Sequence, residues 1–375
     1  MAVTAPGRCR RSVWCSAAPS HFASHLPRLL PCSSHQDLQL IQQKVRHRPG
    51  LLPKLAAAYY VWSFGLGLYG WLAAFWLCGL APALLVPALG IYAAYIFTRG
   101  AEPAQTGSWQ PRFRGWPLWR WLAAYFPATL HKTADLPPGR PYIFAFHPHG
   151  IVSFSAWLTF ASDALGFARL FPGIDCRCLT LRLNFRCPVF REYLLWHGVC
   201  DVSKRSCLTL LGRGKSIFIA VGGGTESLYA KPGANDLVLR RRRGFVKIAL
   251  RTGAALVPVY AFGENSTFRT ANELPPTSLV RRFQRSLTKY SGFTLPFFYG
   301  TGFLLPLGLL PHPVPLDIVV GDPLEVPKFD GDESSTEFAA LVDKYHASYV
   351  AALQALFEAH REKFAKGESS LELVE

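Results

Sequence analysis

The chain is 375 residues long; 50% of it is hydrophobic and 14% aromatic, but only 17% is charged. The 27 Phe, 14 Tyr and 10 Trp need a buried core or a membrane, so general disorder is excluded. Nine cysteines, an odd and sparse number for this length, exclude a disulfide scaffold. The net charge of +16 favours an anionic partner, either a membrane surface or a polyanionic ligand, with nucleic acid as the rival.

The N-terminal region is basic and polar. The first 35 residues contain arginines, serines and prolines but no Asp or Glu. This composition is typical of a disordered tail, which we expect over residues 1–50, or of an organellar transit peptide. A secretory signal peptide is not expected, because no apolar run follows Arg8, Arg10 and Arg11.

A long apolar stretch follows the tail. The 44 residues from Leu55 to Thr98 include no charged side chain and no histidine. As helix they would extend roughly 66 Å, enough to cross a hydrocarbon core of ~30 Å twice. Gly79 and Pro82 lie near the middle and both flanks are basic, so both ends belong on the cytosolic side. We therefore predict a membrane hairpin of two helices over residues 51–100; a buried core hairpin of a soluble protein is the alternative.

After the hairpin the hydrophobic pattern becomes that of an α/β domain, expected over residues 101–367 with a short tail at 368–375. Strands alternating with helices predict a mixed, largely parallel sheet covered by helices. Ser334 and Glu337 form a capping box that opens a long final helix with an apolar face. A helix is expected over 244–251, and strands are expected over 142–146, 216–221, 256–262 and 316–320.

Residues 290–316 are also uncharged, but five prolines, four glycines and His312 interrupt them. Because proline breaks helices, a straight spanning helix is not expected there. The alternatives are a loop that dips into the membrane, an apolar wall for a lipid substrate and a buried irregular loop.

The sequence His147-Pro148-His149-Gly150 directly follows a predicted strand. Side chains at the carboxyl ends of strands usually face the ligand in α/β folds. An imidazole with a pKa near 6.5 suits proton removal at neutral pH, which favours a general base here. A structural role in the turn is one alternative. A metal site is another, but no carboxylate or cysteine lies close in sequence, so no metal is expected.

Three other patterns in the sequence bear on ligand binding. Four consecutive arginines are either a membrane-facing edge or a clamp for the phosphates of a soluble donor. Residues 212–216 resemble the end of a P-loop, but Thr209 replaces its first glycine and a strand follows, so nucleotide binding is not expected. Five cysteines lie between 176 and 207 without a CxxC pair, which favours reduced thiols over zinc. The arginines are Arg240, Arg241, Arg242 and Arg243.

The motifs together resemble the type 2 diacylglycerol acyltransferase family, which also includes monoacylglycerol and wax-alcohol acyltransferases. The resemblance covers roughly 110–365, with the apolar hairpin in place before it. The matching blocks are Tyr125-Phe126-Pro127, YIFAFHPHG at 142–150, NFRCPVFREYLL at 184–195, VGGGTESL at 221–228, RRRRGFVKIALRTGA at 240–254, LVPVYAFGEN at 256–265 and YHASYVAALQALF at 345–357.

This resemblance implies a glycerolipid-acyltransferase-like α/β domain, distantly related to enzymes with an HxxxxD motif. On that motif His149 is the catalytic histidine, but Phe154 stands where the aspartate would be. We therefore expect the carboxylate partner to come from elsewhere, with Glu226 as the candidate; a helix cap or an arginine partner is its alternative role. His147 is expected to hold the turn through a hydrogen bond. The expected substrate-binding residues are Gly150, Asn265, Arg240, Arg241, Arg242 and Arg243.

The implied reaction is acyl transfer from acyl-CoA, a co-substrate, to the hydroxyl of diacylglycerol, with no cofactor. The acceptor alternatives are monoacylglycerol and long-chain alcohols; a non-catalytic lipid-binding protein is the rival class. Expected partners are acyl-CoA, diacylglycerol and the lipid bilayer, without nucleic acid, and a homo-oligomer is compatible with the sequence. We expect the endoplasmic reticulum membrane with a cytosolic active site, or else lipid droplets or a plastid envelope. In that topology the sequon at Asn265 is not glycosylated.

Overall fold

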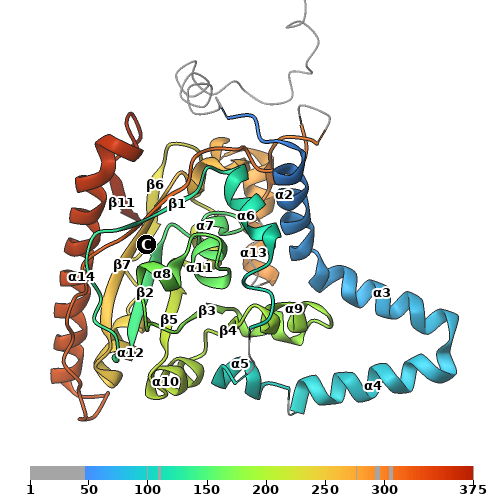
Figure 1. Cartoon of the computed structure of the whole chain (residues 1–375), viewed down its shortest axis with the longest axis horizontal. Helices are drawn as coiled ribbons and strands as arrows, with labels where there is room; N and C mark the ends of the chain where they lie inside the picture. Colours follow the sequence, from blue (N-terminus) through green and yellow to red (C-terminus); the bar gives the residue numbers. More distant parts are fainter. Residues whose placement is uncertain are drawn as a thin grey trace, which may run out of the picture. The chain divides into compact units, whose positions relative to one another are not determined.

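The computed structural model describes residues 47–98, 100–108, 111–275, 277–291, 296–303 and 307–374 (Figure 1). The predicted basic tail and the alternative transit peptide lie outside these residues, apart from positions 47–50.

The apolar stretch forms three helices rather than the predicted two. They are α2 (Leu51–Phe64), α3 (Leu66–Leu80) and α4 (Pro82–Thr98). The first, α2, packs against the domain: Tyr60 is 1% exposed, and its hydroxyl donates to the carbonyl oxygen of Val152 at 3.3 Å. The aromatic ring of Tyr60 also lies 5.3 Å from that of Trp157. One face of α2 thus packs on the domain, whereas Leu51 and Trp62 are 63% and 60% exposed, and the hairpin boundary at residue 51 stays a prediction.

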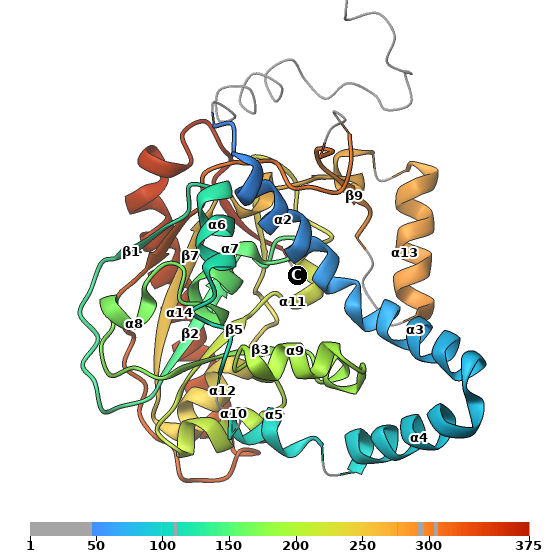
Figure 2. The same ribbon diagram turned by 45° about the vertical axis from the view of Figure 1, so that its right-hand side comes forward.

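The part of the apolar stretch that follows α2 is shorter than the predicted hairpin, and its side chains are more exposed than those of α2. Figures 1 and 2 show α3 and α4 projecting together from the domain. Phe75, Leu84 and Ile91 are each more than 70% exposed. Within the described residues, one helical run, Pro82–Thr106, is long and apolar enough to cross a membrane. The predicted length of roughly 66 Å falls to about 50 Å once α2 is removed, since a helix rises 1.5 Å per residue.

The centre of the domain is a seven-stranded sheet in the order β1-β10-β7-β2-β5-β3-β4. Strands β7, β2, β5, β3 and β4 are parallel, whereas β10 is antiparallel to β7 and carries β1 at the edge. This confirms the predicted mixed, largely parallel sheet. Its strands are β1 (Thr129–Lys132), β2 (Tyr142–His147), β3 (Cys176–Thr180), β4 (Cys200–Asp201), β5 (Ser216–Ala220), β7 (Ala255–Phe262) and β10 (Asp317–Val320).

Side chains alternate across this sheet and build two cores. In β2, Phe144 and Phe146 face an aromatic cluster under the helical segment that follows the strand. Ile143 and Ala145 face the opposite layer, and the Tyr349 hydroxyl donates to the Ala145 carbonyl oxygen at 3.0 Å. Helices on the first face are α6 (Pro117–Tyr125), α7 (Phe154–Ala156), the π-helical turn η1 (Trp157–Ala161), α8 (Phe167–Leu170) and α9 (Phe190–Trp196); those on the second are α10 (Lys204–Gly212), α12 (Gly244–Thr252) and α14 (Thr336–Phe364).

The predicted apolar face of the final helix is confirmed, but the helix begins one residue later than the sequence predicts. The N-cap of α14 is Ser335, whose side chain accepts from the Phe338 amide, instead of the predicted Ser334. Residues expected as a C-terminal tail include β11 (Leu371–Val374), which pairs in parallel with β6 (Asn235–Val238). The remaining elements are α5 (Glu102–Thr106), α11 (Gly223–Glu226), α13 (Leu279–Ser291), η2 (Arg182–Arg186), η3 (Glu264–Ser266), η4 (Ala271–Glu273), β8 (Arg269–Thr270) and β9 (Phe298–Tyr299).

Candidate active site

The two histidines after β2 have different environments. His147 is the last residue of the strand and is fully buried (0% exposed) on the face that α14 covers, 6.1 Å from the Tyr349 ring. Neither of its ring nitrogens has a hydrogen-bond partner within the described residues. The predicted turn-holding hydrogen bond of His147 is therefore wrong. Burial lowers the pKa of His147 to about 3, so its imidazole stays neutral, closed off from solvent.

His149 lies past the strand and is partly exposed. Its Nδ1 atom is 3.1 Å from the carbonyl oxygen of Gly150 and 3.4 Å from the hydroxyl of Ser153. The Ser153 hydroxyl itself donates to the His149 carbonyl oxygen at 2.6 Å. Since a carbonyl oxygen only accepts, Nδ1 carries the proton and Nε2 keeps a lone pair. Burial lowers the pKa of His149, which also favours the neutral ring.

Glu226 is fully buried in α11, the short helix that follows β5. Its Oε1 accepts from the His149 main-chain N–H at 2.5 Å, and its Oε2 accepts from the Val238 N–H at 2.9 Å. Glu226 therefore holds the main chain of His149 and does not pair with the imidazole. A Cβ on Gly222 would lie 2.1 Å from Oε2, so glycine is needed there. Burial raises the pKa of Glu226 to about 7.

A second buried carboxylate, missed by the sequence analysis, lies on the other side of the loop. Glu264 follows β7, the neighbour of β2, and its two oxygens accept from the N–H groups of Phe154 and Ser155, each at 2.9 Å. Burial raises its pKa to about 7. Phe154 thus contributes a main-chain donor where the resembling motif has an aspartate. The sequence does place Glu264 just after a buried strand. Because neighbouring parallel strands end at the same edge of a sheet, this position could have indicated a carboxylate close to the histidine turn.

Gly150 connects these contacts. Its φ of +65° lies in the left-handed region, which favours glycine. A Cβ built on it would lie 2.6 Å from the Cγ of Glu264. The main-chain N–H groups of Gly150, Ile151 and Val152 make no hydrogen bonds within the described part of the chain. The turn after His149 therefore offers unpaired donors beside the imidazole.

The four arginines do not form one cluster. Arg242 donates to the Gly222 carbonyl oxygen and to the Thr225 hydroxyl, both at 3.2 Å, so it braces the glycine-rich turn. Arg243 lies 3.2 Å from a carboxylate oxygen of Asp343 in α14. Arg240 and Arg241 are exposed. Arg242 and Arg243 thus have partners within the protein while Arg240 and Arg241 face solvent, and a phosphate clamp stays a prediction.

Asn265, the other expected substrate-binding residue, is 8% exposed. Its amide nitrogen donates to the Ala234 carbonyl oxygen at 2.9 Å, and its Oδ1 has no partner within the described residues. Its side chain supports the loop before β6, and substrate contact stays a prediction.

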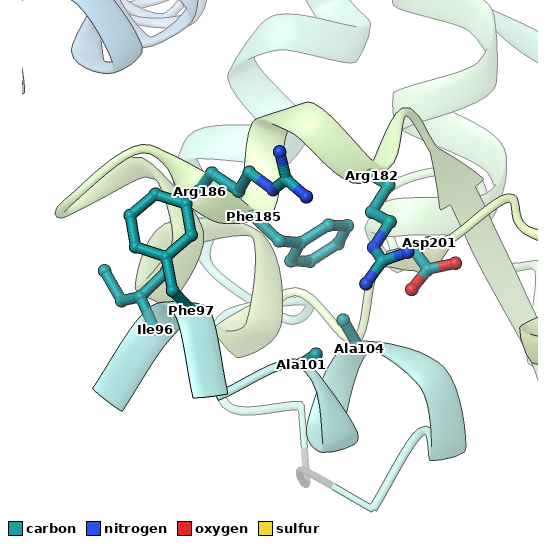
Figure 3. A pocket seen from close by; sticks show the side chains of 8 residues that line it. All are labelled: Ile96, Phe97, Ala101, Ala104, Arg182, Phe185, Arg186 and Asp201. Atoms are coloured by element: carbon teal, nitrogen blue, oxygen red, sulfur yellow. The ribbon is translucent and has the colours of Figure 1, made fainter. Parts of the chain in front are cut away.

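No metal or zinc cluster is found where the structure describes the chain: no three His, Cys, Asp or Glu side chains lie close enough to hold an ion. Burial raises the pKa of Cys178, Cys200 and Cys207 to about 12, so these residues remain thiols. The small pocket in Figure 3, about 40 Å³ in volume, lies between the end of α4, α5 and η2, and no residue of the His149 loop lines it.

A partly exposed imidazole at the carboxyl edge of a parallel sheet, beside main-chain donors, is an arrangement that suits an α/β enzyme of the group-transfer kind. Comparison with known proteins makes the class specific. The family described as "Diacylglycerol acyltransferase" matches residues 81–374, and the chain belongs to this family.

Similar proteins cover most of the chain. Diacylglycerol O-acyltransferase 2A of Umbelopsis ramanniana is 42% identical over 80% of this chain and 85% of its own length. Diacylglycerol O-acyltransferase 2 of Danio rerio is 40% identical over 76% of this chain and 78% of its own length. The human diacylglycerol O-acyltransferase 2-like protein 6 is 38% identical over 80% and 92%. No solved structure matches the chain significantly.

Proposed function

We propose that this chain transfers the acyl group of acyl-CoA to the free hydroxyl of diacylglycerol, with His149 as the general base. The observation that carries the assignment is the ring of His149, whose Nδ1 is engaged by the Gly150 carbonyl oxygen so that the Nε2 lone pair is available. Family membership supports the substrates, since the similar proteins are named as diacylglycerol acyltransferases. No cofactor takes part in this scheme.

The reaction follows from that geometry. Nε2 of His149 removes the hydroxyl proton while the oxygen attacks the thioester carbonyl, which forms the new C–O bond. The N–H groups of Gly150 and Ile151 would stabilise the oxyanion. Collapse of the intermediate breaks the C–S bond, and the imidazolium gives its proton to the departing sulfur. Because burial lowers the pKa of His149, the ring releases this proton readily.

The two buried glutamates act as positioning residues in this scheme. Glu226 binds the amide of His149, and Glu264 binds the amides that begin α7. Together they hold the turn from its two ends, which keeps Nε2 and the free donors at a constant separation. Within the described residues, the hydrogen bonds of both carboxylates go to main-chain N–H groups and those of the His149 ring to Gly150 and Ser153, so we assign neither carboxylate a part in proton transfer.

Substrate placement follows from charge and polarity. Arg240 and Arg241 would bind the phosphates of coenzyme A on the aqueous side. Helices α3 and α4 would enter the bilayer as a hairpin and return to the same side, because about 50 Å of apolar helix is too short for two crossings of ~30 Å. We place this membrane at the endoplasmic reticulum with the active site facing the cytosol, where basic flanks remain.

The test is acyl transfer by the full chain in neutral-lipid-free membranes, with labelled acyl-CoA and each acceptor supplied in turn. We expect labelled triacylglycerol from diacylglycerol, resolved by thin-layer chromatography. A product formed only from monoacylglycerol or a long-chain alcohol would contradict the acceptor assignment. Absence of every labelled product, with acyl-CoA still bound, would contradict the enzyme itself and favour the lipid-binding alternative.

A further inference from the structure

Helix α13 carries its apolar side chains on the outside. Leu279, Val280 and Phe283 are 79%, 43% and 62% exposed. Their spacing of one, three and four positions places them on one face of the helix. The side toward the domain is polar instead: Gln284 is 2% exposed, and Arg281 donates to the side-chain oxygen of Asn272 at 2.7 Å. The helix is thus amphipathic in the direction opposite to that of a helix covering a soluble core.

The apolar face of α13 continues into the neighbouring segment. The Phe283 and Phe297 rings stack with centroids 6.2 Å apart and planes 6° from parallel. Farther along, Phe303, Leu307 and Leu309 are also exposed. Figure 2 shows α13 on the side of the domain from which α3 and α4 project. Exposed apolar groups gathered in this way mark an interaction surface rather than scattered surface residues.

Charge identifies the occupant of this surface. The sequence of α13 contains three arginines, one lysine and no acidic residue, within a chain of net charge +16. A second copy of the same surface would bring like charges together, whereas an anionic lipid surface neutralises them. A basic helix with an exposed apolar face is the pattern of helices that lie in the plane of a membrane interface.

We propose that α13 is an in-plane membrane anchor, distinct from the α3–α4 hairpin, that inserts Leu279, Val280 and Phe283 below the headgroups of anionic lipid. This second attachment fixes the rotation of the domain on the bilayer, which a single flexible hairpin leaves free. The inference goes beyond the acyl transfer and holds whichever acceptor is acylated.

The test is photolabelling of the full chain in phosphatidylcholine nanodiscs with and without about 30% phosphatidylserine. A diazirine on the upper acyl chain reports lipid contact, and labelled peptides are identified by mass spectrometry. We expect α13 peptides to be labelled, more strongly with phosphatidylserine and less in high salt. Peptides of α4 serve as the internal reference, and no turnover is needed, so failure here is separate from failure of the proposed function.

Two variants sharpen the result. Phe283→Asp should lower α13 labelling about threefold or more, because it replaces the ring that we place below the lipid headgroups by a charged carboxylate. Thr277→Asp adds the same carboxylate at an exposed position just before α13, outside its apolar face, and should change labelling far less. Wild-type α13 without label while α4 is labelled would overturn the proposal. Equal labelling in both lipid mixtures, or cross-links between two α13 helices, would overturn it as well.

Discussion

The turn after β2 and the helices α3, α4 and α13 satisfy opposite requirements. Around the turn, two buried glutamates accept four main-chain N–H groups, so polar atoms are buried and paired. On α3, α4 and α13, large apolar side chains are exposed, which marks these helices as an interaction surface. The proposed reaction geometry and the proposed membrane attachment thus fall on separate parts of the described chain, and we expect that each can be disturbed without the other.

The largest effect should come from His149→Ala. Loss of the general base is expected to lower kcat by roughly 10² to 10⁴. Membrane attachment should not change, because His149 is not part of the exposed apolar helices α3, α4 and α13. Turnover by the variant in membranes, measured with labelled acyl-CoA at equal protein level, checks this. Near-normal turnover would mean that the proton goes to another group.

Glu264→Ala should be the most destabilising change at the turn. It leaves the buried N–H groups of Phe154 and Ser155 unpaired, at a cost of roughly 2–5 kcal/mol in the free energy of unfolding, and should lower Tm by roughly 5–15 °C. Glu325→Ala is the control, because that glutamate pairs with Arg140 on the surface and should cost under about 1 kcal/mol. Thermal unfolding in detergent measures both; equal losses would contradict the buried role of Glu264.

The exposed arginines should affect donor binding alone. Arg240→Ala with Arg241→Ala is expected to raise the KM for acyl-CoA about tenfold with little change in kcat. Arg243→Ala, whose side chain faces Asp343, should leave that KM unchanged. Initial rates over a range of acyl-CoA concentrations separate the two parameters. Unchanged KM with weaker membrane attachment would support the membrane-edge alternative for these arginines.

The smallest effect on activity should come from His147→Phe, which keeps the ring volume and removes two unpaired nitrogens. The folded pKa of His147, about 3, lies below its unfolded value of 6.5. Its contribution to stability is therefore present above pH 6.5 and is lost as the pH falls toward 3. The Tm of the wild type should fall below that of the variant on acidification. A growing advantage of the wild type at low pH would contradict the buried neutral imidazole.

The sheet and the histidine turn could be predicted because their signals are local. An apolar run marks β2, and the motif after it places His149 at the edge of the sheet. The carboxylates could not be assigned in the same way, since Glu264 meets Phe154 across 110 positions of chain. In the sequence the four adjacent arginines likewise suggest a single binding site. In the structure, however, Arg242 contacts the glycine-rich turn and Arg243 lies beside Asp343. Tertiary contacts decide such cases, and periodicity carries no information about them.

The apolar stretch shows a different limit. Its composition does not distinguish a helix that faces lipid from one that packs on aromatic side chains. Tyr60 of α2 packs against Trp119 and Trp157, so one face of this helix belongs to the core, whereas Trp62 of the same helix is 60% exposed. An apolar sequence predicts that the side chains are removed from water, but it does not tell whether lipid or the protein core surrounds them.

The pairing of β11 with β6 has a practical consequence for handling the protein. Val374 lies opposite Val238, and the Val238 amide binds the same carboxylate that holds the amide of His149. Strand β11 is thus connected to the main chain of His149 through Val238 and Glu226. An affinity tag, a fluorescent fusion or a shortened end at the carboxyl terminus would disturb the edge strand and, through it, catalysis.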